Sequence, residues 1–193
     1  MRLLARALAV VLALLPAAAH SQATLEAAPG VRVSTTYEYY DVQGATEREI
    51  RARLKRSGPE GHDAFTRWHI RWSYPHAVAG GRCAPGPVTV DVRITFIFPR
   101  WTPPAAASDD LRRQWATVLA GLERHEDGHR DIALRAAREI QETLRALPPR
   151  ASCAEVNRAA TAAGQAILER SRREHERYDE VTKHGLTQGA RWR

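Results

Sequence analysis

The sequence predicts an α+β domain in which a small antiparallel sheet packs against two long C-terminal helices. The first half of the chain alternates apolar and polar residues, as half-buried strands do. The second half repeats its apolar residues every three or four positions, which is typical of amphipathic helices. The predicted order is strand, helix, strand, strand, helix, helix.

The N-terminus predicts a secretory signal peptide over residues 1–23. Arg2 and Arg6 precede the apolar run "ALAVVLALLPAAA", and small residues follow it. We expect cleavage after Ala23 or Ala19. An uncleaved membrane anchor is the alternative, although the apolar run is short for a bilayer span. Residues 24–193 then form one exported domain, periplasmic or secreted, with no further membrane span.

Each predicted strand and the first helix have a local signal. The segment 31–42, "VRVSTTYEYYDV", is rich in β-branched and aromatic residues. Thr46 and Glu49 form a capping-box pattern that starts a short helix, which Gly58-Pro59 ends. The segments "RWHIRWSY" and "PVTVDVRITFIF" alternate cleanly and predict two further strands. The Gly/Pro-rich "AGGRCAPGP" between them predicts a loop.

Two helices follow the predicted sheet. Ser108 or Asp109 caps the first, which runs to about Leu147 and stops at Pro148-Pro149. Ser152 opens the second, which fades near Tyr178.

The two cysteines, Cys83 and Cys153, are expected to pair, because an exported chain with an even cysteine count forms disulfides. The bridge would close a loop of about 70 residues and contribute roughly 4 kcal/mol by the chain-entropy estimate. Two metal-binding thiolates are the alternative, which the lack of a C-x-x-C pair disfavours.

The net charge of +7 comes from arginines that are interleaved with glutamates, as in "ERSRREHERYDE". This pattern is typical of solvated helix faces, and no nucleic-acid-binding motif accompanies it. We therefore expect no nucleic-acid partner, although attraction to an anionic envelope or polymer stays possible.

The first long helix carries two histidines on its apolar stripe. Residues that recur every three or four positions lie on one face of an α-helix. This stripe consists of Leu111, Trp115, Val118, Leu122, His125, His129, Ile132, Ala136 and Ile140. Imidazoles at positions i and i+4 can converge on one ion. Glycine at position 128 costs roughly 1 kcal/mol of helix propensity, which indicates that something approaches the backbone there.

The stretch "HEDGH" is an H-E-x-x-H motif, which is typical of zinc metalloproteases. Neutral imidazoles bind zinc and leave a coordination position open for water. The motif predicts His125 and His129 as ligands and Glu126 as the general base and acid. Two core histidines with polar partners are the alternative.

A third protein ligand must come from elsewhere in the chain. Arg135 stands where a metzincin has its third histidine, which excludes that class. The candidates near the end of the last helix are His184, His175, Asp179, Glu174 and Glu176. We favour His184, because its segment "YDEVTKHGLTQG" is compact and turn-like.

Five segments together resemble the DUF922 family, described as predicted bacterial secreted zinc-dependent proteases. They are "YYDVQGATEREIRARLKRSGP", the Trp-rich strand, "ITFIFPRW", "LERHEDGHRDIA" and "YDEVTKHGLTQG". The resemblance implies that His125 and His129 are ligands and that Glu126 is catalytic. It also implies that Tyr178-Asp179, Thr182 and His184-Gly185 complete the site.

The sequence thus predicts an exported zinc-dependent peptidase that acts on a peptide or protein substrate in the cell envelope. Tyr178 is expected to stabilise the tetrahedral oxyanion by a hydrogen bond, or else to pack the last helical turn. Two alternative functions stay open: a non-catalytic, metal-stabilised module that binds envelope polymer or a partner, and a zinc amidase that acts on cell-wall peptide.

Overall fold

The computed structural model describes residues 30–192. The predicted signal peptide and both of its cleavage positions lie outside these residues. Among the described residues, no helix is long and apolar enough to cross a membrane.

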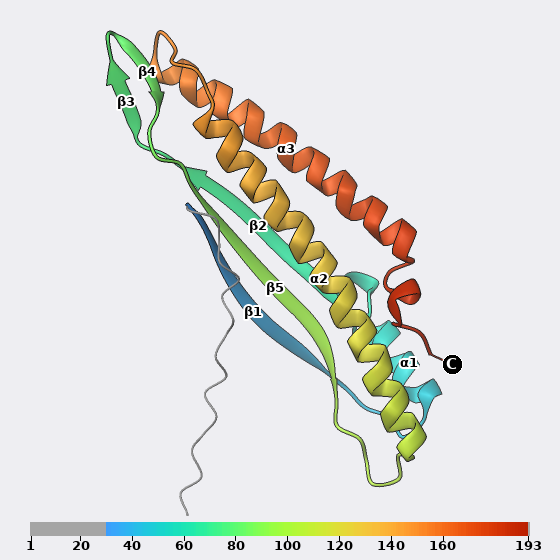
Figure 1. Cartoon of the computed structure of the whole chain (residues 1–193). Helices are drawn as coiled ribbons and strands as arrows, with labels where there is room; N and C mark the ends of the chain where they lie inside the picture. Colours follow the sequence, from blue (N-terminus) through green and yellow to red (C-terminus); the bar gives the residue numbers. More distant parts are fainter. Residues whose placement is uncertain (1–29, 193) are drawn as a thin grey trace, which may run out of the picture.

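The fold is the predicted α+β arrangement, with a long sheet beside two longer helices (Figure 1). Its strands are β1 (Val31–Val42), β2 (Phe65–Ser73), β3 (His76–Ala79), β4 (Arg82–Pro85) and β5 (Thr89–Trp101). Its helices are α1 (Glu47–Ser57), α2 (Asp109–Arg145) and α3 (Cys153–Thr182), with the short 3-10 turns η1 (Pro59–Gly61) and η2 (Leu186–Gln188).

The three long strands lie in the order β1-β5-β2. The β2 strand is antiparallel to β5, as expected, whereas β1 runs parallel to β5, from Val31 beside Val90 to Val42 beside Trp101. The expected antiparallel pairing thus holds for β2 with β5 and for β3 with β4, and does not hold for β1. The chain passes through α1 and β2 between β1 and β5, and such a connection allows parallel pairing that a direct hairpin would not.

The segment "AGGRCAPGP" was predicted as a loop, but most of it belongs to a β3–β4 hairpin. Gly80 and Gly81 form its turn, and both have positive φ (56° and 72°). Two consecutive positive φ angles suit a two-residue hairpin turn, and glycine adopts them without steric cost. The Gly-Gly pair was the sequence signal for this hairpin.

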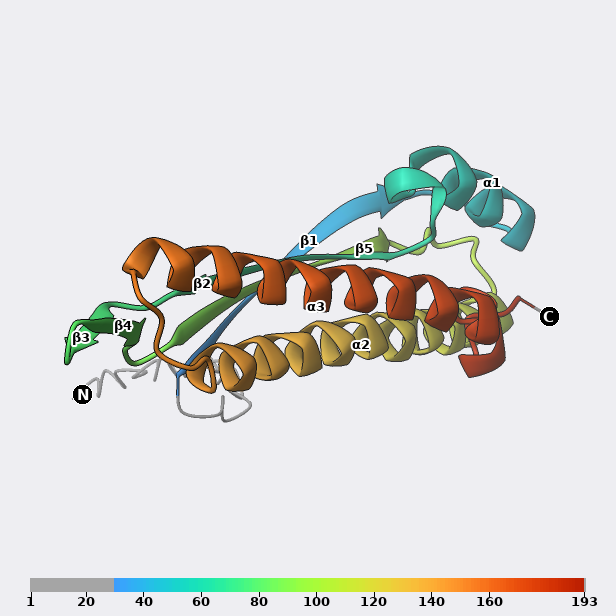
Figure 2. The same ribbon diagram turned by 90° about the horizontal axis from the view of Figure 1, so that it is seen from above.

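The main core lies between the sheet and α2. On β5, the side chains of Val90, Val92, Ile94 and Phe96 are almost fully buried, and the apolar stripe of α2 packs on them. Every member of the predicted α2 stripe is buried. Helix α3 runs beside α2, as the view from above shows (Figure 2). It meets β2 through the Trp72 ring, which lies against Gly164, and the Trp68 ring, which stacks on His175.

The helix ends follow the predicted caps. The hydroxyls of Thr46, Ser108 and Ser152 accept hydrogen bonds from the backbone N–H groups three residues later. Helix α3 continues to Thr182, four residues beyond its predicted end. Lys183, His184 and Gly185 then adopt left-handed φ angles, which turn the chain back towards α2.

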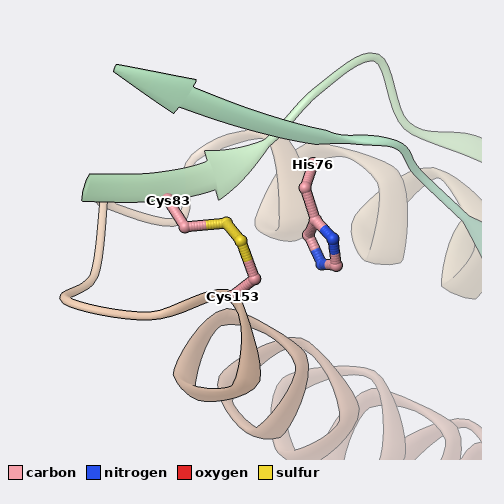
Figure 3. Close-up of side chains that lie close together, drawn as sticks. All are labelled: His76, Cys83 and Cys153. Carbon is pink, nitrogen blue, oxygen red and sulfur yellow. A yellow bond between two sulfur atoms is a disulfide. The ribbon is translucent and has the colours of Figure 1, made fainter. Parts of the chain in front are cut away.

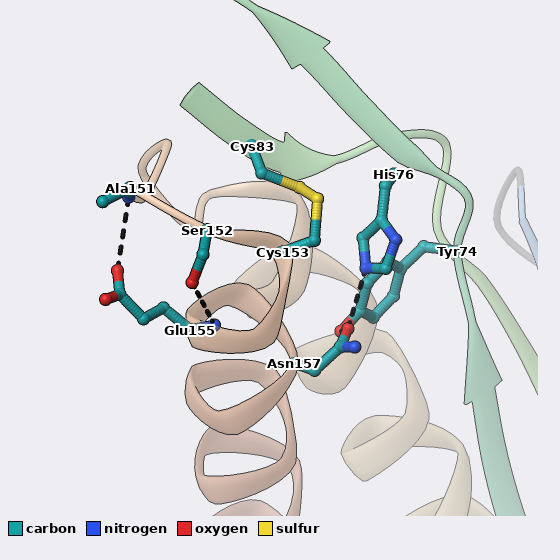
Figure 4. Close-up of a disulfide and its surroundings, with 8 residues drawn as sticks. All are labelled: Tyr74, His76, Cys83, Ala151, Ser152, Cys153, Glu155 and Asn157. Carbon is teal, nitrogen blue, oxygen red and sulfur yellow. Dashed lines mark hydrogen bonds between the residues drawn. A yellow bond between two sulfur atoms is a disulfide. The ribbon is translucent and has the colours of Figure 1, made fainter. Parts of the chain in front are cut away.

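The predicted disulfide is present between Cys83 on β4 and Cys153 at the start of α3. Backbone hydrogen bonds in both directions between Cys83 and Arg150 accompany it. On the other side, Asn157 Oδ1 accepts a hydrogen bond from the Tyr74 hydroxyl and lies 2.9 Å from His76 Nε2 (Figure 4). These contacts fix the hairpin to the beginning of α3, at the far end of the helices from η2.

Candidate metal centre

Two histidines of α2 and one aspartate of α3 converge on one point. His125 Nε2 lies 3.0 Å from Asp179 Oδ1, and His129 Nε2 lies 3.1 Å from the same oxygen. The three atoms are all within 4.8 Å of one another. Ligand atoms around a tetrahedral zinc at roughly 2.0 to 2.1 Å lie about 3.3 Å apart. The spacing of these atoms therefore fits one small metal ion.

The hydrogen bonds behind His125 leave its Nε2 free to bind a metal. Gln188 Nε2 donates to the Tyr178 hydroxyl, which orients the Gln188 amide so that its Oε1 lies 3.0 Å from His125 Nδ1. An amide oxygen only accepts, so Nδ1 carries the proton and Nε2 has a lone pair. This lone pair faces a carboxylate oxygen, and a cation between them removes the repulsion.

His175 contacts the Nδ1 side of His129, as Gln188 contacts the Nδ1 side of His125. The two Nδ1 atoms are 2.8 Å apart, so one of them donates to the other. When His129 is the donor, its Nε2 is free for a metal. The His175 ring stacks on Trp68 at 5.0 Å, and among the described residues its buried Nε2 has no hydrogen-bond partner.

Burial lowers the pKa values of His125 and His129. Both are therefore neutral near pH 7, which is the form that binds a metal. Burial also lowers the pKa of His175, to about 4, and the neighbouring His129 lowers it further. None of these three imidazoles carries a charge that would repel a cation.

Glu126 lies beside the three converging atoms and is 3% exposed. Its Oε2 accepts a hydrogen bond of 2.6 Å from the hydroxyl of Thr66 on β2. Burial, with a smaller contribution from the charge of Asp179, raises the pKa of Glu126 to about 7. A carboxylate with such a pKa can both accept and release a proton near neutral pH.

A pocket of about 120 Å³ opens onto these groups. Its wall comes from β2 and the segment before it, from α2, and from α3. The lining residues are His62, Ala64, Phe65, Thr66, Trp68, His125, Glu126, His129, His175 and Asp179. The pocket is large enough for a few water molecules or a small part of a substrate.

Gly128 is explained by Tyr178. A β-carbon on Gly128 would overlap the Tyr178 hydroxyl and ring, so only glycine lets this phenol reach α2. The ring stacks on His125 with the two planes 7° apart, and the hydroxyl donates to the backbone carbonyl of His125. Tyr178 therefore lies behind the histidines and is absent from the pocket wall, which supports the packing role over the expected oxyanion role.

His184 lies close to the three-atom group but outside it. Its Nδ1 is 3.4 Å from Asp179 Oδ1, and its side chain is 59% exposed. Its ring lies 5.2 Å from that of His62, which lines the pocket. The structure thus brings Asp179, one of the weighed alternatives, to the position expected of His184, and the ligand role of His184 stays a prediction.

The remaining candidates lie in different places. Thr182 donates to the Tyr178 carbonyl, and its hydroxyl is 3.3 Å from His125 Nδ1. Gly185 packs against the His125 side chain. Glu174 faces away and pairs with Arg135 at 2.5 Å, and Glu176 is exposed.

Thr66 and Gln188 were not predicted as parts of the site. Both contact it from elements far from the H-E-x-x-H motif in sequence, and no local pattern marks them. Asp179 had a signal: it follows His175 by four residues, so the two share one face of α3 once that helix is known to continue to Thr182.

A second group of possible ligands, His76, Cys83 and Cys153, lies at the hairpin (Figure 3). Cysteine binds metals as a thiolate. Both sulfurs here are joined in the disulfide, so neither is a thiolate. This group is therefore part of the hairpin clamp and is no metal site while the disulfide is intact.

The model of a family described as "Bacterial protein of unknown function (DUF922)" matches residues 37–185. The chain belongs to the DUF922 family. The match extends from β1 to the turn after α3, so it includes all three converging side chains, His125, His129 and Asp179. No curated protein and no solved structure matches the chain.

Proposed function

We propose that this DUF922 protein is an exported zinc-dependent hydrolase that cleaves peptide bonds. One observation carries the proposal: two neutral imidazoles and a carboxylate converge on one point beside a buried glutamate, in a pocket that can admit water. Two histidines and one carboxylate, with one position left open, form a common donor set for catalytic zinc. The ligands proposed are His125, His129 and Asp179.

The residues around the site suit hydrolysis. Zinc, when bound, supplies a Lewis acid that polarises a carbonyl and lowers the pKa of water. The Glu126 carboxylate accepts the proton of the attacking water and then delivers it to the leaving amine. Thr66 holds Oε2 of Glu126 in place, which keeps the carboxylate oriented during both transfers. Gln188 fixes the tautomer in which His125 Nε2 can bind the metal, and His175 does the same for His129 when it accepts a hydrogen bond from His129 Nδ1.

Export is proposed from two features. The N-terminal sequence has the charge, apolar run and small residues of a signal peptide. The Cys83–Cys153 disulfide is consistent with an oxidising compartment such as the periplasm.

The proposal can be tested by removing and restoring the metal. We expect the purified mature chain to hold about one zinc per molecule and to cleave members of a broad unstructured-peptide pool. Dialysis against a chelator should abolish cleavage, and one equivalent of zinc should restore it. A protein that is isolated without zinc and shows no cleavage after zinc is added would contradict the proposal.

A further inference from the structure

The outer edge of β2 opens onto a groove of about 500 Å³. Five consecutive residues of β2, Trp68 to Trp72, line one side of it, and Gln165, Leu168 and Arg172 of α3 line the other. Successive side chains of a strand point to opposite faces of the sheet. Five in a row can line one groove only if the groove follows the edge of the strand.

This edge is unpaired in the part of the chain that the structure describes. The β2 strand pairs with β5 on one side only and is the last strand of the sheet. An edge strand presents backbone N–H and C=O groups that can bind an added extended chain. The groove therefore has the hydrogen-bonding groups needed for one more strand.

The groove is also positively charged. Arg71 and Arg172 are both exposed, and no acidic side chain lines the groove. Among residues 30–192, neither arginine forms an ion pair within 4 Å. Asp91, which lies opposite Arg71 on β5, accepts two hydrogen bonds from Arg32. Two guanidinium groups that have no ion-pair partner within 4 Å, beside a free strand edge, favour a negatively charged partner.

The same charges disfavour a second copy of this chain. Antiparallel pairing of two β2 edges centred on His69 would place Arg67 of one copy opposite Arg71 of the other. Like charges opposite each other destabilise strand pairing. An acidic chain meets no such repulsion.

The groove leads directly to the metal centre. Trp68 lines both the groove and the pocket, and its ring stacks on His175. Thr66, two residues along the same strand, contacts Glu126. An extended chain that pairs with β2 and continues past Trp68 would therefore enter the pocket beside Glu126.

We propose that the β2 edge, with Arg71 and Arg172, binds an extended acidic segment of a polypeptide substrate. Cleavage of the bound chain beside Glu126 rests on the proposed function. Binding in the groove does not, because it requires neither zinc nor hydrolysis. The acidic residues of the substrate lie to one side of the bond to be cleaved.

The test measures binding by the full mature chain carrying Glu126→Gln, so that cleavage does not interfere. The probe is a fluorescein-labelled decapeptide of alternating glutamate and threonine, followed by anisotropy. The controls are the matching lysine–threonine decapeptide and a glutamate–threonine analogue methylated on every backbone nitrogen. Charge reversals Arg71→Glu and Arg172→Glu are compared with Arg48→Glu on α1, which packs against β1 at the opposite edge of the sheet.

We expect the acidic peptide to bind at least about tenfold more tightly than the basic one, a difference of about 1.4 kcal/mol. Each groove reversal should weaken binding by a similar factor, and Arg48→Glu should leave it unchanged. The methylated analogue should lose binding, because it cannot pair with a strand. Equal binding of acidic and basic peptides, equal effects of all three reversals, or full binding of the methylated analogue would overturn the inference. Binding as expected, together with a wild type that is isolated without zinc and cleaves no peptide after zinc is added, would refute the proposed function and leave this groove standing.

Discussion

The hydroxyl of Tyr178 on α3 occupies the space beside Gly128 on α2 that a β-carbon would fill. This contact lets α3 lie close to the H-E-x-x-H motif and brings Asp179, the next residue, to the two histidines. The glycine inside the motif thus has a structural reason, and that reason can be tested.

Gly128→Ala should destabilise the protein, although alanine favours helices by roughly 1 kcal/mol over glycine. Overpacking against Tyr178 typically costs about 1–3 kcal/mol and should exceed that gain. Urea unfolding of Gly128→Ala, Tyr178→Ala and the double variant measures the coupling. The double variant should be more stable than the sum of the single effects predicts, and simple additivity would show that the two residues do not compete for space.

Asp179→Ala should lower zinc affinity by more than about 100-fold, because it removes a proposed ligand, whereas outer-shell changes typically cost about 10 to 100-fold. His184→Ala should have the smaller effect, since its Nδ1 lies outside the three-atom group. Competition with a chromophoric chelator measures both affinities. A larger loss in His184→Ala than in Asp179→Ala would restore His184 as the third ligand.

His175→Phe should lower zinc affinity by about 10 to 100-fold while keeping the ring that stacks on Trp68. The reason is that His129 Nδ1 loses its hydrogen-bond partner, so the tautomer that leaves Nε2 free is no longer favoured. Glu174→Gln, one residue away on the exposed surface, is the matched control. Unchanged affinity in His175→Phe would show that the imidazole only packs.

The disulfide variant Cys83→Ser/Cys153→Ser should lose about 4 kcal/mol in the free energy of unfolding by the chain-entropy estimate, since the bridge joins residues 70 positions apart. Urea unfolding measures the loss, and the wild type in reductant should unfold like the variant. Zinc content should not change, because the bridge lies at the first residue of α3, whereas Asp179 of the candidate metal centre lies near the end of that helix. Figure 1 shows that α3 is a single long helix between these points. Equal stability of the variant and the oxidised wild type would contradict the expectation.

Much of the fold follows from local patterns in the sequence. Thr46, Ser108 and Ser152 mark helix starts by the hydrogen bonds that their hydroxyls accept, and the stripe of α2 predicts its buried face. The parallel pairing of β1 could not be predicted, because a strand with the same pattern can pair in either direction. Pairing direction depends on the path of the chain between strands.

Some residues of the candidate site could be predicted from local sequence, and others could not. His125, Glu126 and His129 share one helix, so their spacing alone predicts how they lie. Asp179, Thr66 and Gln188 reach the site from three other segments, and their positions depend on how α3, β2 and the final turn pack. The end of α3 was placed four residues too early, which hid the alignment of Asp179 with His175.

In the proposed mechanism, Glu126 transfers protons beside a metal that other residues hold. The most direct measurement is the zinc content and peptide hydrolysis of Glu126→Gln beside the wild type. The substitution keeps the shape of the side chain, and Thr66 can still donate to its oxygen. We expect about one zinc per chain in both proteins and a loss of hydrolysis of about 100-fold to 10,000-fold in the variant. Hydrolysis at the wild-type rate by a zinc-loaded Glu126→Gln protein would contradict the account.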